Sequence, residues 1–370
     1  GSIVTNSKVG WQFGYEMVWV LGVTVILMIG MTALGARLGV FLEGTPCTEL
    51  ARRAGRPLAA LTGITLFLIA ACFQFGNNLG VLYALEPWLD ADADSAAPGW
   101  SIVVLIAMNG AIIAALLGFR HLYRPVERFM KLLVAVMILG FAANLLLARP
   151  SLRDFCLGWI PSLPAEARET VIPRIEVQGG ERVVADHLWA VQGVLGTTFS
   201  VAAAFYHAYL VRQKGWSRDD LQQGLFDSVV GIVTLGGMSM MVMVTAAAVL
   251  HGNPAVTELK DAAAIARQLK PLFGSLAVAL FCAGIFAGAL SSFLVNAMIG
   301  GTVLSDGLGW GGGMDDPGPK SATVLALLIG MGVAIAFKAF QIISGNLIVL
   351  GQALTVLGNP LLAGLMLWLA

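Results

Sequence analysis

Nine residues in the middle of a long apolar stretch interrupt its pattern, and they read Gly196-Thr197-Thr198-Phe199-Ser200-Val201-Ala202-Ala203-Ala204. The surrounding stretch, 188–211, is long enough to cross about 30 Å of hydrocarbon at about 1.5 Å per residue. Small and hydroxyl-bearing residues in such a span have two explanations: close packing between helices, or a place where the helix unwinds. An unwound segment would expose backbone carbonyl groups inside a membrane, where an ion can bind them.

Apolar runs of similar length recur on both sides of this stretch. They cover 15–42, 58–85, 100–119, 129–148, 188–211, 228–250, 275–303, 321–337 and 343–369. Of the 370 residues, 58% are hydrophobic and 12% are charged, whereas a soluble domain has about half and about a quarter. We therefore predict an all-α polytopic membrane protein, with residues 1–370 forming a single transmembrane domain in the plasma membrane.

Basic residues mark every second connection between these spans. They follow the first, third and fifth spans: Arg37, Arg52, Arg53, Arg56, Arg120, Arg124, Arg128, Lys131, Arg212, Lys214 and Arg218. The positive-inside rule places these connections in the cytoplasm and the acidic connection 86–99 outside. The longer segment 149–187 carries both signs of charge and four prolines, and we interpret it as an extracellular cap. In this orientation residue 1 lies near the middle of the membrane, on a helix that runs outward.

The remaining composition argues against other classes of function. Basic and acidic residues each number 22, so the formal net charge is zero and nothing suggests a nucleic-acid partner. The four cysteines are scattered, and two of them lie in apolar runs, which disfavours a disulfide framework or a cysteine metal site. No covalent chemistry is indicated. We expect neither an enzyme nor a bound cofactor, and no obligatory protein partner is evident.

Four sequence blocks occur in an order and spacing that resembles the Nramp family of divalent-metal transporters. They are Gly35-Ala36-Arg37-Leu38-Gly39-Val40, Tyr206-His207-Ala208-Tyr209-Leu210-Val211, residues 280–292, and Leu347-Ile348-Val349-Leu350-Gly351-Gln352 with Pro360. Each block is short, but together they extend the resemblance over nearly all of the chain. It implies a LeuT-type inverted-repeat fold in which helices 1 and 6 are broken at the bilayer midplane. On this alignment the first half of helix 1 and the segments after helix 10 are absent.

The resemblance also implies a set of metal-binding positions. Family members bind their metal through an Asp-Pro-Gly-Asn run in helix 1 and an Ala-x-x-Met-Pro-His run in helix 6. Gly1 matches the glycine of the first run and Ser2 stands at its asparagine, although Gly-Ser is also a common remnant of cloning. Thr197 takes the place whose carbonyl group faces the metal, and Ser200 replaces the methionine. Gln352, in the tenth-helix block, completes the implied site, unless the buried amides only link helices.

The replacement of methionine by Ser200 has a chemical consequence. A thioether is a soft ligand that favours transition metals, whereas Mg²⁺ and Ca²⁺ take oxygen ligands. A serine supplies a hydroxyl group and leaves more space. Mg²⁺ gives up its water reluctantly and keeps several molecules of it, so a wider site made of oxygen atoms suits it. Mn²⁺ also accepts oxygen ligands and should remain a substrate.

A second departure concerns protons. In proton-coupled family members an Asp and a Glu on helix 3, together with the helix 6 histidine, are implicated in proton transfer. On the alignment these positions hold Gln74, Asn77 and Ala202, none of which titrates. The second family histidine is matched by His207, which either packs between helices or lines an exit path.

This combination is similar to the Nramp-related magnesium transporters of prokaryotes, which implies location in the inner membrane. We expect import of Mg²⁺ and Mn²⁺ by uncoupled, facilitated transport, with divalent metal ions and the lipid bilayer as the partners. Three alternatives stay open: a proton-coupled Mn²⁺/Fe²⁺ transporter, a non-transporting sensor or signalling domain on the same fold, and a carrier of organic substrates. The last would show aromatic or charged side chains at the helix breaks, where this chain has serine and alanine.

Overall fold

The structure is a computed structural model that describes residues 2–86, 99–118, 123–164, 174–178, 181–185, 188–254, 256, 262–314, 316–339 and 345–370. Its helices are α1 (Ser2–Phe13), α2 (Val18–Phe41), α3 (Pro46–Ala54), α4 (Arg56–Leu85), α5 (Gly99–Gly118), α6 (Tyr123–Ala148), α7 (Leu152–Leu157), α9 (Trp189–Thr198), α10 (Val201–Gln213), α11 (Leu221–Val249), α12 (Ala262–Leu308), α13 (Pro317–Ala339) and α14 (Gly345–Leu369). Strands β1 (Arg174–Gln178) and β2 (Glu181–Ala185) form an antiparallel hairpin.

The predicted membrane spans all coincide with helices. Within the described part of the chain, seven segments are long and apolar enough to cross a membrane: Val18–Phe41, Arg56–Leu85, Gly99–Gly118, Trp189–Gln213, Leu221–Val249, Phe281–Leu308 and Pro317–Ala339. The apolar segments Ile138–Ala148 and Thr355–Leu369 belong to two further long helices, α6 and α14. The β hairpin lies inside the segment predicted as an extracellular cap, so the membrane part of the protein is helical as expected.

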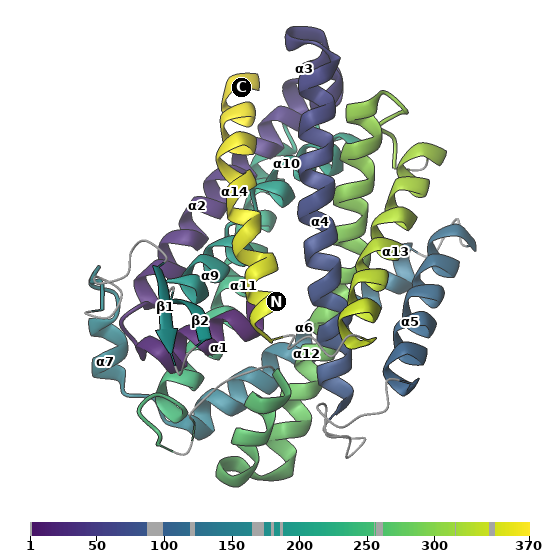
Figure 1. Ribbon diagram of the computed structural model, residues 1–370. Helices are drawn as coiled ribbons and strands as arrows, with labels where there is room; N and C mark the ends of the chain where they lie inside the picture. Colours follow the sequence, from purple (N-terminus) through teal and green to yellow (C-terminus); the bar gives the residue numbers. More distant parts are fainter. Residues whose placement is uncertain are drawn as a thin grey trace.

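The helices surround a central region near which the described chain begins. Figure 1 shows the N-terminal end about midway along α4, and the C-terminal end close to α3 at one extremity of the molecule. Helix α12 packs along α4, α6 and α13, while α2 packs on α10, α1 on α11 and α14 on α9. Segments far apart in the sequence therefore lie side by side in the described structure.

Helix α2 approaches α10 very closely along one face. A Cβ atom added at Gly39 would lie 2.6 Å from the carbonyl oxygen of Ala208, and one at Gly35 would collide with the carbonyl of Ala204. The two glycines are four residues apart and so occupy the same helix face. Backbone-to-backbone contact of this kind is how membrane helices gain packing energy without a hydrophobic driving force. It fixes the half-helix α10 against a long, continuous span.

The short helix α3 was not predicted, because its polarity resembles that of a loop. Pro46 occupies its first turn, where a proline fits without loss of a hydrogen bond. Arg52 and Arg53 stand in its last turn, where their positive charges interact favourably with the negative end of the helix dipole. The carboxylate of Glu49, almost fully buried, lies 2.7 Å from Arg52. The proline and the arginines of α3 are visible in the sequence. A search for long apolar runs, which predicts membrane spans, does not find a short polar helix.

A buried carboxylate joins α3 to two membrane helices at this end of the molecule. Asp306 of α12 accepts hydrogen bonds from the hydroxyl groups of Thr45 (2.6 Å), Thr48 (2.9 Å) and Tyr209 of α10 (2.6 Å). The Tyr209 oxygen in turn accepts the backbone N–H of Cys47 at 3.3 Å. Burial raises the pKa of the Cys47 thiol to about 12, so this thiol stays protonated and unreactive at neutral pH.

Candidate functional site

The sixth membrane span is broken within the stretch that the sequence singled out. Helix α9 ends at Thr198, Phe199 and Ser200 have non-helical backbone angles, and α10 begins at Val201. The Ser200 hydroxyl oxygen accepts the backbone N–H of Ala203 at 3.3 Å, which is the usual arrangement of a serine that caps a helix N-terminus. The break predicted for helix 6 is thus confirmed. A break in helix 1 is not tested, because α1 starts at Ser2 and Gly1 lies outside the described residues.

Helix α14 stabilises two of the carbonyl groups at this break. The Asn359 amide donates to the carbonyl oxygen of Phe199 at 2.9 Å, and the Thr355 hydroxyl donates to that of Gly196 at 3.4 Å. Both side chains are almost fully buried. A buried carbonyl group without a hydrogen-bond partner costs free energy in a membrane. These two hydrogen bonds reduce that cost at the break and fix the position of its carbonyl groups.

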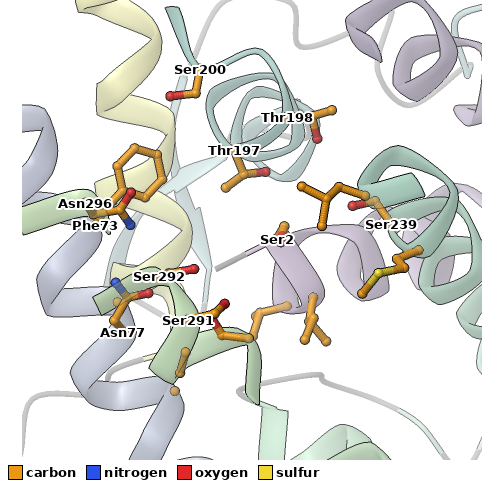
Figure 2. A pocket seen from close by; sticks show the side chains of 18 of the residues that line it. Ser2, Phe73, Asn77, Thr197, Thr198, Ser200, Ser239, Ser291, Ser292 and Asn296 are labelled. Atoms are coloured by element: carbon orange, nitrogen blue, oxygen red, sulfur yellow. The ribbon is translucent and has the colours of Figure 1, made fainter. Parts of the chain in front are cut away.

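A cavity of about 390 Å³ lies where the break, the start of α1 and helices α2, α4, α11 and α12 meet. Besides Tyr83, its polar lining consists of the hydroxyl and amide side chains labelled in Figure 2: Ser2, Asn77, Thr197, Thr198, Ser200, Ser239, Ser291, Ser292 and Asn296. Asp, Glu, His, Lys, Arg and Cys are absent from its lining among the residues that the structure describes. The described side chains that line the cavity therefore carry no formal charge, and apolar residues make up most of the lining.

Two methionines, Met28 and Met238, also line the cavity. Met238 is buried in the apolar cluster around Tyr83 and Phe281, and Met28 packs against the cluster around Phe205. Neither belongs to α9 or α10, so neither of these thioethers stands at the helix break itself. The oxygen-bearing side chains there come from Thr197, Thr198 and Ser200.

Four of the predicted site residues meet in this cavity: Ser2, Thr197, Ser200 and Asn77. The Thr197 hydroxyl donates back to the carbonyl groups of Gly193 and Val194 in its own helix, at 3.0 and 3.2 Å. The side chain of Gln352 is outside the described part of the structure, although its backbone belongs to α14. The metal-binding role of all these residues remains a prediction.

The predicted proton-path positions form an amide network. Gln74, fully buried, donates its amide to the carbonyl of Phe293 in α12 and accepts the Asn77 amide N–H at 3.0 Å. The Asn78 side-chain amide donates to the backbone carbonyl of Gln74 at 2.8 Å, and the side-chain amide of Asn109 in α5 donates to the Asn78 side-chain amide oxygen at 2.7 Å. Each of these contacts uses an amide N–H as donor, which a carboxylate lacks. The network ties α4 to α5 and α12.

Ala202 and His207 lie away from the cavity. Ala202 is buried in the apolar cluster between α10 and its neighbours, and the neighbouring residue Ala203 lines the cavity instead. The His207 Nε2 atom lies 3.5 Å from the hydroxyl of Ser228, and its imidazole packs edge-on against Trp216 at 6.0 Å between ring centres. These contacts agree with the packing alternative for His207, and an exit path through it stays a prediction.

Five cavity residues were missed by the sequence: Thr198, Ser239, Ser291, Ser292 and Asn296. Thr198 stands next to a residue that was singled out, but its hydroxyl oxygen is buried and without a hydrogen-bond partner in the described structure. The serines on α11 and α12 look like ordinary small residues of a membrane span. Asn296 carried the one available signal, since an amide in the middle of an apolar run is uncommon.

Within the residues that the structure describes, no three Asp, Glu, His or Cys side chains come close enough to hold a metal ion. The described polar side chains of the central cavity are hydroxyl and amide groups, and the thioethers of Met28 and Met238 lie beside them.

Comparison with known proteins agrees with this architecture. A divalent metal cation transporter, MntH, of Verminephrobacter eiseniae is 25% identical over 381 residues, covering 100% of this chain and 77% of that protein. The protein of the same name from Klebsiella pneumoniae strain 342 is 23% identical over 316 residues, covering 82% of this chain and 68% of that protein. A crystal structure of a mutant manganese transporter of Eremococcus coleocola superposes with a TM-score of 0.74 at 16% identity, covering 98% of this chain and 73% of that one.

That superposition confirms the predicted LeuT-type arrangement of helices in a multi-pass membrane protein. The family model described as natural resistance-associated macrophage protein-like matches residues 1–370. The chain belongs to the Nramp family.

Proposed function

We propose that this chain carries divalent metal ions, Mg²⁺ and Mn²⁺, into the cell by facilitated transport without proton coupling. The observation that carries the proposal is the chemistry of the central cavity. At the broken helix, a family member would need ligands for a metal, and the described lining offers neutral oxygen atoms. The relatives named divalent metal cation transporters support metal ions as the class of substrate.

The preference for Mg²⁺ rests on the identity of Ser200 and on the size of the cavity. No soft ligand stands at the helix break, and the cavity of about 390 Å³ has room for roughly a dozen water molecules at about 30 Å³ each. Mg²⁺ keeps several of its waters when it binds to proteins.

The uncoupled mode rests on the amide network of α4. Gln74 and Asn77 bond to each other and to α12 through groups that do not take up or release protons. The lining of the cavity supplies no Asp, Glu or His among the described residues. Among the described lining residues, a proton therefore finds no Asp, Glu or His side chain to bind. The proposal needs no cofactor and no covalent chemistry.

The proposal is tested by uptake of Mn²⁺ into proteoliposomes that hold the purified chain. We expect uptake above that of protein-free liposomes, and we expect millimolar Mg²⁺ to reduce it by competition, because both ions accept the same oxygen ligands. The control replaces Mg²⁺ with choline chloride at matched ionic strength. Mn²⁺ uptake that excess Mg²⁺ leaves unchanged would contradict the substrate assignment, and absence of any uptake would favour a non-transporting sensor.

A further inference from the structure

The polar side chains of the central cavity fall into two groups according to their hydrogen bonds. Thr197, Ser200 and Ser291 use their hydroxyl groups in bonds to their own helices, in the last case to the carbonyl of Gly288 at 3.0 Å. By contrast, no side-chain hydrogen bond to the described part of the protein is made by Ser2, Thr198, Ser239, Ser292 or Asn296, and of these five only Ser292 and Asn296 belong to α12. Ser292 and Asn296 are both only partly buried, so water in the cavity can reach them and serve as their hydrogen-bond partner.

Ser292 and Asn296 form one polar stripe on the scaffold helix α12. They are four residues apart, so they lie one above the other on the same helix face. Figure 2 shows Ser292 beside Asn77 and Asn296 beside Phe73, on the α4 and α12 side of the cavity, with Thr198 and Ser239 on the other side. The stripe therefore forms a wall apart from the helix break.

The dimensions of the cavity decide what this wall can touch. Six waters at about 30 Å³ each occupy about 180 Å³, well within the 390 Å³ available. The break and α12 line the same cavity, so waters kept by an ion at the break would fill part of the space between them. Waters bound to a dication are strong hydrogen-bond donors, and the Asn296 amide oxygen and the Ser292 hydroxyl oxygen are acceptors.

We propose that Ser292 and Asn296 bind the water molecules that the transported ion keeps, and that they thereby favour Mg²⁺ over ions that lose water more easily. This inference rests on the proposed function, because it assigns the α12 wall a role in the same site. Ser292 and Asn296 would form hydrogen bonds to waters that are bound to the ion, and they would not bind the ion directly.

The substitution Asn296→Leu removes the amide while keeping the approximate size of the side chain. Loss of one hydrogen bond from an ion-bound water corresponds to roughly a tenfold increase in the KM for Mg²⁺. We expect the KM for Mn²⁺ to change less than about threefold, because Mg²⁺ is the ion that releases its waters most reluctantly. Ser292→Ala should act in the same direction, measured as uptake into proteoliposomes.

The matched control is Ser291→Ala, which removes a neighbouring hydroxyl from the same cavity and the same helix. That hydroxyl already donates to Gly288, so we expect its loss to change the KM for Mg²⁺ less than about twofold. Equal effects of Ser291→Ala and Ser292→Ala would overturn the inference. An Asn296→Leu variant that transports Mg²⁺ as the wild type does, or that loses both ions equally, would overturn it too.

A measurement independent of transport counts the waters on bound Mn²⁺ by ¹H electron–nuclear double resonance in H₂O and D₂O. The inference predicts the same number of coordinated waters in the wild type and in Asn296→Leu, because Asn296 does not touch the ion. One additional water in the variant would show that Asn296 is a direct ligand, and the inference would be wrong. If the wild type carries Mn²⁺ but no Mg²⁺, the proposed function fails, and this count still tests the α12 wall.

Discussion

An inside-negative potential of 100 mV is expected to raise the accumulation of free Mg²⁺ in proteoliposomes about 2,000-fold at equilibrium. Each charge that crosses this potential gains about 2.3 kcal/mol, so a dication that moves alone gains about 4.6 kcal/mol. At about 1.4 kcal/mol per factor of ten, this energy gives the stated ratio. The measurement uses a Mg²⁺-sensitive dye inside the vesicles and a potassium diffusion potential set with valinomycin.

The control for this prediction has equal potassium on both sides, so that valinomycin produces no potential. Uptake should then stop when the internal and external free Mg²⁺ concentrations are equal. Exchange of one Mg²⁺ for two protons would move no net charge, and its equilibrium would not respond to the potential. Accumulation that is the same with and without the potential would therefore contradict uncoupled transport.

Replacing Ser200 with methionine is expected to have the second largest effect. Ser200 lines the cavity and caps α10, so a longer apolar side chain removes a hydroxyl group and fills space that hydrated Mg²⁺ needs. The loss of a hydrogen bond to a charged group costs about 1.5–3 kcal/mol, which corresponds to a loss of Mg²⁺ uptake of roughly 10- to 100-fold. Mn²⁺ uptake should fall less, because Mn²⁺ can use the thioether that is introduced.

The control for this substitution is Ser200→Thr, which keeps the hydroxyl group and the ability to cap the helix. It should retain Mg²⁺ uptake within about threefold of the wild type, since only a methyl group is added. Circular dichroism and size-exclusion chromatography of all three proteins would detect misfolding. If Ser200→Met leaves both Mg²⁺ and Mn²⁺ uptake unchanged, Ser200 does not face the ion.

Much of the fold could be predicted from the sequence because membrane spans are local signals. About 20 apolar residues define a helix without reference to the rest of the chain. The break in the sixth span was predicted from the family resemblance, since the interruption by Gly196, Thr197 and Ser200 is by itself also compatible with close helix packing. The structure places the interruption at Phe199 and Ser200, inside the predicted stretch.

The parts that could not be predicted depend on contacts between distant segments. Asn359 and Thr355 donate hydrogen bonds to carbonyl groups of the break, and each lies more than 150 residues along the chain from the residue that it contacts. Asn296 shares a cavity with Ser2 because α12 passes beside the start of α1. Such juxtapositions follow from tertiary packing, on which the local pattern of a single sequence carries little information.

Gln74 and Asn77 stand at the positions where the family resemblance implies acids in proton-coupled members. In the structure their amides bond to one another and to α12. Amide groups do not titrate, so a measurement of proton movement tests uncoupled transport most directly.

That measurement is the internal pH of proteoliposomes, followed with a trapped pH-sensitive dye while an inward Mn²⁺ gradient is applied. The potential is held at zero with valinomycin and equal potassium, so that protons are not pulled through leaks. Uncoupled transport predicts Mn²⁺ uptake with no metal-dependent change of internal pH, and no acceleration when an inward proton gradient is imposed. Metal-dependent acidification under these conditions would show that protons travel through the protein, and it would contradict the account in favour of proton-coupled transport.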